Sequence, residues 1–175
     1  MKKIFQAAHL ASQWHASQRR KGAEREPYIN HLLEVAQLVS AAEASEDVIC
    51  AALLHDAIED QDITAATISS LFGPDVGAMV CEVSDDKWLP KAEQKAAQIA
   101  AAPGLSRGAK LIKLADKISN VGSIASSPPV DWSKQRRLDY VDFCRKVVAQ
   151  LRGTDAMLEE MFDKAAEATG AAIAA

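Results

Sequence analysis

The sequence of 175 residues contains few cysteines, and they are scattered at Cys50, Cys81 and Cys144 with no Cys-x-x-Cys pair. Three dispersed cysteines argue against a disulfide framework and against a cysteine-based zinc site. We therefore expect a reducing compartment, the cytoplasm. Polar residues interrupt the stretch after Met1-Lys2-Lys3, so it lacks the apolar segment of a signal peptide.

Long apolar runs and an excess of positive charge are also absent. No run of about 18 apolar residues occurs, so we expect no membrane span. Lys and Arg number 20 against 24 Asp and Glu, which gives a net charge of −4. This balance argues against a nucleic-acid partner, which requires a basic face. It still permits a local basic pocket for a small phosphorylated nucleotide. The sequence leaves the oligomeric state open.

Helix-forming residues dominate what is present. Ala is the commonest residue, and aromatic residues make up only 5%. Helix formers such as Ala, Leu and Glu are abundant, and no strand alternation stands out. The sequence predicts one all-α domain over 1–175 of eight to ten helices, with its core at about 5–160 and a frayed tail at 170–175. We place the helices at 2–18, 30–44, 45–59, 64–72, 74–84, 89–101, 106–125, 131–151 and 154–168.

The sharpest local feature is the pair His55-Asp56 near the end of the helix predicted over 45–59. That helix is apolar nearly all round, which indicates that it is buried. A buried carboxylate needs a cation or strong hydrogen-bond donors. A His-Asp pair by itself is more often structural, with the His hydrogen-bonded and the Asp exposed at a helix end.

Two further segments favour a metal. His31 begins one apolar helix, and Asp116 lies within another. With His55 and Asp56 they form a set of two histidines and two carboxylates. Such mixed ligands suit Mn²⁺, Fe²⁺ or Zn²⁺, and the carboxylates favour Mn²⁺.

Glu59 and Asp60 follow four residues after His55 and Asp56, so they project from the same side of the helix. Carboxylates beside a metal can orient a water molecule and take its proton. The structural alternative is a solvated acidic helix end. Acidic residues at a C-terminal helix end oppose the helix dipole, which makes that alternative weaker.

Together these motifs resemble the HD superfamily and, more narrowly, the hydrolase domain of the RelA/SpoT alarmone enzymes. Within that group the chain is most similar to the small stand-alone hydrolases of the metazoan SpoT-homologue type and their bacterial relatives. The resemblance rests on the segments Arg19-Arg20-Lys21, Pro27 to His31, Ala51 to Asp60, Asp85-Asp86-Lys87 with Leu89-Pro90-Lys91, Lys113 to Asn120, and Trp132 to Tyr140.

The resemblance implies an HD-type helical domain with a central metal pocket. It implies removal of the 3′-pyrophosphate of guanosine tetra- or pentaphosphate, which yields GDP or GTP and pyrophosphate with Mn²⁺ as the metal. The implied roles are metal ligation by His31, His55, Asp56 and Asp116, handling of the attacking water by Glu59 and Asp60, and nucleotide contacts from Arg20, Lys21, Asn120, Arg136 and Tyr140.

Other functions stay open at this point. Relatives of the small type are also linked to the 2′-phosphate of NADPH, to adenosine alarmones and to antitoxin roles. A metal-stabilised nucleotide sensor is the non-enzymatic alternative, and the intact Glu59-Asp60 pair argues against it. The departures from the family pattern concern base selectivity and pocket shape, and they are Gly22, Leu32 and Gly122-Ser123. A stripe of Lys110, Lys113 and Lys117 is more typical of a solvated helix face than of a phosphate site.

Overall fold

The computed structural model describes all residues 1–175 and confirms the all-α class. It has ten α-helices and one short 3₁₀ helix, and it contains no strand. The elements are α1 Lys2–Trp14, α2 Ile29–Ala41, α3 Glu46–Leu54, α4 Ala57–Gln61, α5 Ala65–Phe72, α6 Pro74–Val83, α7 Lys91–Ala101, η1 Ala102–Gly104, α8 Arg107–Ser126, α9 Lys134–Ala149 and α10 Ala156–Ala174. No helix combines the length and the apolar character that a membrane crossing requires.

Short polar side chains cap the beginnings of five of the ten α-helices. In five helices the residue before the first turn accepts a hydrogen bond from the backbone N–H three residues later. This contact satisfies one of the free N–H groups at a helix start. The capping residues are Ser45, Thr64, Ser106, Ser133 and Asp155.

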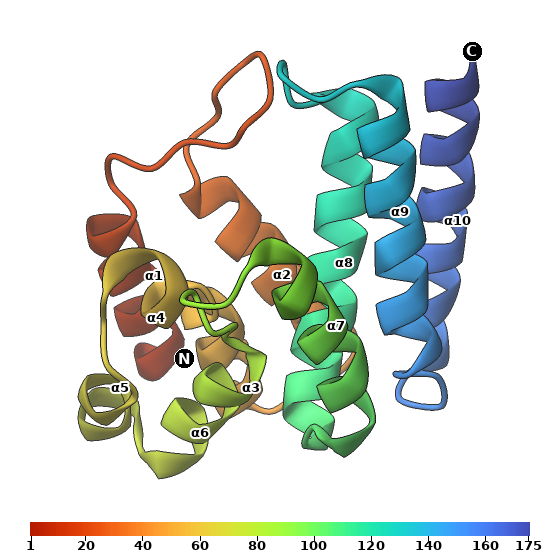
Figure 1. The fold of residues 1–175 in the computed structure, drawn as a ribbon. Coiled ribbons are helices and arrows are strands. Elements are labelled where there is room, and N and C mark those ends of the chain that lie inside the picture. Colours follow the sequence, from red (N-terminus) through yellow and green to blue (C-terminus); the bar gives the residue numbers. More distant parts are fainter.

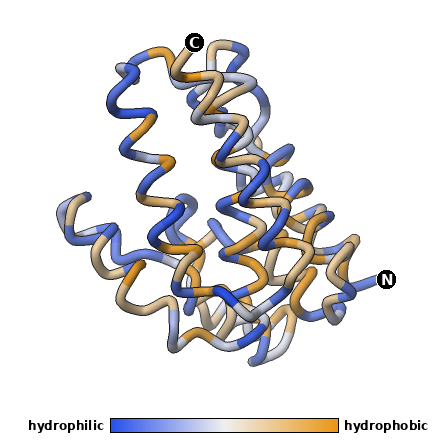
Figure 2. The backbone as a smooth tube through the Cα atoms, turned by 90° about the vertical axis from the view of Figure 1, so that its right-hand side faces the viewer, coloured by the Kyte–Doolittle hydropathy of each residue, from blue (hydrophilic) through white to orange (hydrophobic).

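The central element is α8, which packs against α2, α3, α6, α9 and α10. In Figure 1, α8, α9 and α10 lie side by side, and α1 to α6 gather beside them with α2 and α3 next to α8. Figure 2 shows hydrophobic and hydrophilic residues alternating along the helices, as amphipathic helices require. A single cluster of 38 buried apolar residues joins the two groups of helices.

The helix predicted over 45–59 is interrupted, so that prediction was wrong at its C-terminal part. Helix α3 ends at Leu54, His55 and Asp56 form a turn, and α4 begins at Ala57. The backbone of Asp56 has φ −97° and ψ 1°, in the sparsely populated region between helix and strand. The break turns the Asp56 side chain toward Tyr28, whose hydroxyl donates a hydrogen bond to it at 2.7 Å.

The predicted frayed tail was also wrong. Helix α10 continues to Ala174, and Ile173 is only 6% exposed. Its buried residues recur every three or four positions, so one face of the whole helix packs on α8. The hydroxyl of Thr169 donates to the carbonyl of Val121 at 3.1 Å, and Lys134 donates to the carbonyl of Ala174 at 2.8 Å.

Two loops close over one end of the helices, residues 15–28 and residues 127–133 (Figure 1). They meet in an isolated bridge between Gly22 and Pro129. A Cβ atom at Gly22 would lie 2.5 Å from the carbonyl oxygen of Ser127, so only glycine permits this approach. The contact fixes the segment that carries Arg20 and Lys21 against the segment that precedes α9.

The buried end of α10 generates the first prediction. Ile173→Ala should lower the free energy of unfolding by about 2 kcal/mol, because it removes a packed side chain from the face against α8. The Tm should then fall by roughly 4–8 °C for a chain of this length. Met161→Ala on the same helix is the control, since Met161 is 37% exposed and its loss should cost less. An unchanged Tm for Ile173→Ala would contradict a packed C-terminal end.

Candidate metal centre and active site

A pocket of about 510 Å³ opens between α8, α9, α7, the turn from α3 to α4 and the loop over residues 18–28. Its volume is within the range of small-molecule sites. Ten of the eleven residues singled out in the sequence line it, and they are Arg20, Lys21, His55, Asp56, Glu59, Asp60, Asp116, Asn120, Arg136 and Tyr140. The eleventh, His31, is buried directly behind Asp56 and Asp116.

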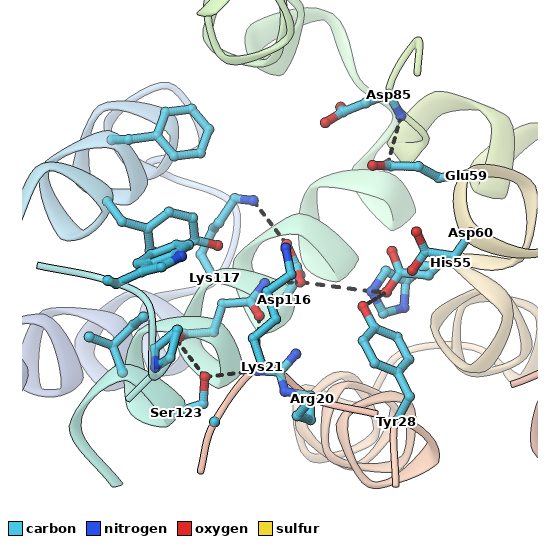
Figure 3. Close-up of a pocket in the computed structure, with 18 of the residues that line it drawn as sticks. Arg20, Lys21, Tyr28, His55, Glu59, Asp60, Asp85, Asp116, Lys117 and Ser123 are labelled. Carbon is cyan, nitrogen blue, oxygen red and sulfur yellow. Dashed lines mark hydrogen bonds and ion pairs between the residues drawn. The ribbon is translucent and has the colours of Figure 1, made fainter. Parts of the chain in front are cut away.

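Two histidines and two carboxylates meet at the pocket floor. The Nε2 atom of His31 lies 3.4 Å from Asp116 Oδ1 and 3.7 Å from Asp56 Oδ2. The Nε2 atom of His55 lies 3.2 Å from Asp56 Oδ2 and 3.8 Å from Asp116 Oδ1. Figure 3 shows Asp116 facing His55 across this floor. The structure therefore brings together the four residues from three separate segments.

Hydrogen bonds on the outer side of each ring decide which nitrogen faces inward. His55 Nδ1 lies 2.7 Å from the carbonyl oxygen of Ala52, which can only accept, so Nδ1 carries the hydrogen. His31 Nδ1 lies 2.8 Å from Ser119 Oγ, and that hydroxyl donates its own hydrogen to Glu34 at 2.5 Å. Both Nε2 atoms are buried without a hydrogen-bond partner. In each ring Nδ1 is therefore engaged on the outer side and Nε2 is the atom that faces the carboxylates, as in metal-binding histidines.

The electrostatics of the floor favour a positive charge at its centre. Burial opposes ionisation of Asp56 and Asp116, yet cationic neighbours hold the pKa of each carboxyl below its usual range. Burial likewise opposes a charge on His55, but the two carboxylates raise its pKa to about 10. The ligand atoms of His31, His55 and Asp116 lie within 4.8 Å of one another. This cluster of imidazole and carboxylate groups fits a divalent metal ion.

Glu59 and Asp60 lie on α4, beside the cluster, and both line the pocket (Figure 3). Burial raises the pKa of both carboxyl groups, and the charges of Asp85 and Asp56 raise that of Glu59 further. The backbone N–H of Asp85 donates to Glu59 Oε2 at 3.3 Å. The side-chain amide of Gln18 donates to Asp60 Oδ2 at 2.7 Å. Each carboxylate is therefore held from its outer side.

Arg20 and Asn120 connect the loop over residues 15–28 to the carboxylate of Asp116. Arg20 donates to Asn120 Oδ1 at 3.1 Å and to Ser123 Oγ at 2.8 Å. Asn120 in turn donates to Asp116 Oδ1 at 2.5 Å. The guanidinium carbon of Arg20 lies 5.8 Å from the centre of the Tyr28 ring. These contacts hold the Arg20 plane at the pocket wall, next to the floor.

The wall formed by α9 and the loop before it is aromatic and basic. Trp132 and Tyr140 pack edge to face with ring centres 5.3 Å apart. The guanidinium of Arg136 lies 4.7 Å from the centre of the Trp132 ring. Lys95 on α7 lies 5.1 Å from the Phe143 ring centre. Aromatic faces and cations in this arrangement suit a planar base that carries phosphates.

The expectation of a solvated lysine stripe on α8 was wrong for two of its three members. Lys117 is only 3% exposed and donates to Asp116 Oδ2 at 2.9 Å. Lys113 donates to the carbonyl of Val83 at 2.6 Å and lies 3.8 Å from Asp85. Both lysines line the pocket, because α8 is buried on several sides and leaves no free face there.

Two residues beside the floor received no role from the sequence. Tyr28 donates to the carboxylate of Asp56, and Gln18 donates to that of Asp60. Tyr28 stands three residues before His31, a spacing that places it one turn away on a helix. That spacing could have indicated Tyr28. Nothing in the local sequence indicates Gln18, whose partner is 42 residues away.

Comparisons with known proteins agree with this geometry. Residues 7–155 match the HD domain family. The chain is 46% identical over 162 residues to guanosine-3′,5′-bis(diphosphate) 3′-pyrophosphohydrolase MESH1 of Xenopus tropicalis. That alignment covers 91% of this chain and 90% of the relative. The chain is 43% identical over 164 residues to MESH1 of Drosophila melanogaster, with 93% and 92% coverage.

A solved structure is also similar. A metazoan ortholog of SpoT that hydrolyses ppGpp superposes with a TM-score of 0.92, at 41% identity and 97% coverage of both chains. These similarities agree with the family resemblance that the motifs predicted.

The floor of the pocket generates the second prediction. Adding Mn²⁺ to metal-free protein should raise the Tm, because a ligand that binds only the folded state at about 100 times its Kd adds roughly 2.7 kcal/mol. Asp116→Asn and His55→Ala should abolish most of this rise, whereas Glu167→Gln on the exposed side of α10 should keep it. Thermal melts with metal analysis measure both quantities. If Mn²⁺ leaves the Tm of protein purified without metal unchanged, the assignment of these residues as metal ligands is wrong.

Proposed function

The chain belongs to the HD domain family, and from that premise we propose that it is a metal-dependent hydrolase that removes the 3′-pyrophosphate of guanosine tetra- or pentaphosphate. The products are GDP or GTP and pyrophosphate. The observation that carries the proposal is the floor of the pocket, where the Nε2 atoms of two buried histidines face the buried carboxylate of Asp116 and the half-buried carboxylate of Asp56, beneath basic and aromatic walls.

The proposed metal ligands are His31, His55, Asp56 and Asp116. Half of these donors are carboxylates, which favours Mn²⁺ over softer ions. A bound divalent ion supplies Lewis acidity, which activates water and offsets charge on the phosphoryl oxygens. The protein contributes the orientation of the four side chains through Ser119, Ala52 and Tyr28.

Glu59 and Asp60 are the proposed catalytic residues. They orient the attacking water and take its proton while the water oxygen bonds to the phosphorus next to the ribose 3′-oxygen. The bond from that phosphorus to the 3′-oxygen then breaks, pyrophosphate leaves, and the 3′-oxygen takes up a proton to become the ribose hydroxyl of GDP or GTP. Carboxyl groups whose pKa is raised by burial are stronger bases at neutral pH than exposed ones, which suits this role.

The proposed nucleotide contacts come from the walls. Arg20 offers a flat guanidinium for stacking on the base, and Lys21 offers a point charge for a phosphate. Asn120 lies one turn after Asp116, so it faces a substrate held at the floor. Arg136 and Tyr140 complete the opposite wall.

The proposal extends to the organisation and location of the chain. Residues 1–175 act as one hydrolase domain, which is supported by the single apolar core. We assign the protein to the cytoplasm, in line with its three free cysteines. The partner is a small phosphorylated nucleotide.

A substrate panel tests the proposal directly. With Mn²⁺, guanosine tetraphosphate should give the highest kcat/KM, and the released product should be pyrophosphate. The adenosine analogue and NADPH should be slower, the last with release of orthophosphate. Faster turnover of either one would transfer the function to that substrate, and binding without turnover would identify a sensor.

The third prediction separates chemistry from binding. Glu59→Gln and Asp60→Asn should each lower kcat by about 10²-fold or more, a typical loss for a general base. KM and the Kd for Mn²⁺ should change by less than about threefold. Steady-state kinetics and metal titration on the same preparations measure these values. Loss of Mn²⁺ from either variant would make that residue a ligand instead.

The fourth prediction concerns recognition of the nucleotide's purine base by Arg20. Arg20→Ala should raise KM more than it lowers kcat, because stacking is equal in the ground and transition states. Arg20→Lys should restore KM only in part, since an ammonium group cannot stack. Arg107→Ala, an exposed arginine at the start of α8 outside the pocket, is the control. If KM stays at the wild-type value in Arg20→Ala, the base-binding role is wrong.

A further inference from the structure

A partly buried polar network lies behind Asp60, and the proposed mechanism leaves it without a role. His15, after the end of α1, is only 2% exposed. Its ring stacks on Tyr28 with centres 5.4 Å apart and an angle of 16° between the planes. Gln61, on α4, approaches the same place from the other side. Withdrawing polar side chains from water, fully for His15 and in part for Gln18 and Gln61, is costly unless each makes specific hydrogen bonds.

The three shortest hydrogen bonds in this network run in one direction. Asp60 accepts, so Gln18 presents its NH₂ group to it, at 2.7 Å. The carbonyl oxygen of Gln18 then faces inward and accepts from Gln61 at 2.6 Å. The same oxygen lies 2.6 Å from His15 Nδ1, which must therefore carry the hydrogen. The Gln18 amide oxygen thus accepts from two donors, His15 and Gln61, and the amide nitrogen donates to the Asp60 carboxylate.

We propose that Gln18 is a positioning residue that orients the Asp60 carboxylate for its work on the attacking water, with His15 and Gln61 holding the Gln18 amide in place. The inference rests on the role proposed for Asp60. It adds a residue from the loop over 15–28, which lies 42 positions away in the sequence.

The position of Asp60 explains why such support is needed. Asp60 lies on a helix of only five residues, and its side chain is exposed at the pocket surface. The negative charge of Asp56 also repels it, which raises the pKa of Asp60, whereas the Gln18 hydrogen bond lowers it. A donor on the far side fixes one carboxylate oxygen and leaves the other to face the pocket.

Two substitutions at Gln18 separate the hydrogen bond to Asp60 from simple packing. Gln18→Met keeps the length of the side chain and removes all its hydrogen bonds. Gln18→Glu keeps an acceptor for His15 and Gln61 but places a like charge against Asp60. Both variants should lower kcat about 10-fold or more, in the range of losses when a supporting hydrogen bond is removed. KM and the Kd for Mn²⁺ should stay within about threefold. Gln37→Met, on the exposed side of α2, should behave as the wild type.

A double-mutant cycle identifies the residue through which Gln18 acts. In the Asp60→Asn background, Gln18→Met should change kcat by less than about twofold, because the carboxylate that it orients is gone. An equal loss in both backgrounds, or an unchanged kcat in the single variants, would overturn the inference. If Asp60→Asn itself keeps full turnover, the proposed function of Asp60 fails instead. Should Gln18→Met not fold, Gln18→Glu retains the inner hydrogen bonds and gives the answer.

Discussion

The structure depends on two carboxylates, Asp56 and Asp116, that lie close together among helices. Each of them approaches both His31 and His55. Asp56 and Asp116 are held by burial at a place where isolated negative charges would be strongly unfavourable. The surrounding elements stabilise these negative charges. Helix α8 carries Asp116 through the centre, and the break after α3 turns Asp56 inward. Tyr28, Asn120 and Lys117 each donate a hydrogen bond to one of the two carboxylates.

Lys117 also explains how a chain with net charge −4 can accommodate the polyanionic substrate proposed for it. A divalent cation and the Lys117 ammonium together outweigh the two carboxylates by one positive charge. Lys113, Lys95, Arg20 and Arg136 add positive charge to the walls. The pocket therefore attracts phosphates locally, while acidic residues elsewhere set the overall sign. Charge balance over a whole sequence says little about such a site, because fields in a cleft depend on the nearest groups.

Much of this arrangement could be predicted from local sequence, and the reason for each failure is physical. Five of the ten α-helices begin at capping residues that are visible in the sequence. His31, His55, Asp56 and Asp116 stand out because they interrupt apolar segments. The break at Asp56 and the burial of Lys117 depend on packing between elements that no local pattern records. Gln18 is the extreme case, since its entire role rests on a partner contributed by another helix.

The pocket combines a floor and walls of different origin, and this division bears on selectivity. The floor is built on the packed helices α2, α3 and α8, where any displacement would disturb the core. The walls include two loops that meet through the glycine at position 22, which tolerates no side chain against Ser127. Gly122 adjoins Ser123, which orients Arg20, and a Cβ atom there would meet nothing within 4 Å. Gly22 is thus a departure from the family pattern that lies in the wall, away from the four floor residues, whereas Gly122 lies on α8 and does not line the pocket. A change at Gly22 should therefore act first on which nucleotide is accepted, before it acts on hydrolysis itself.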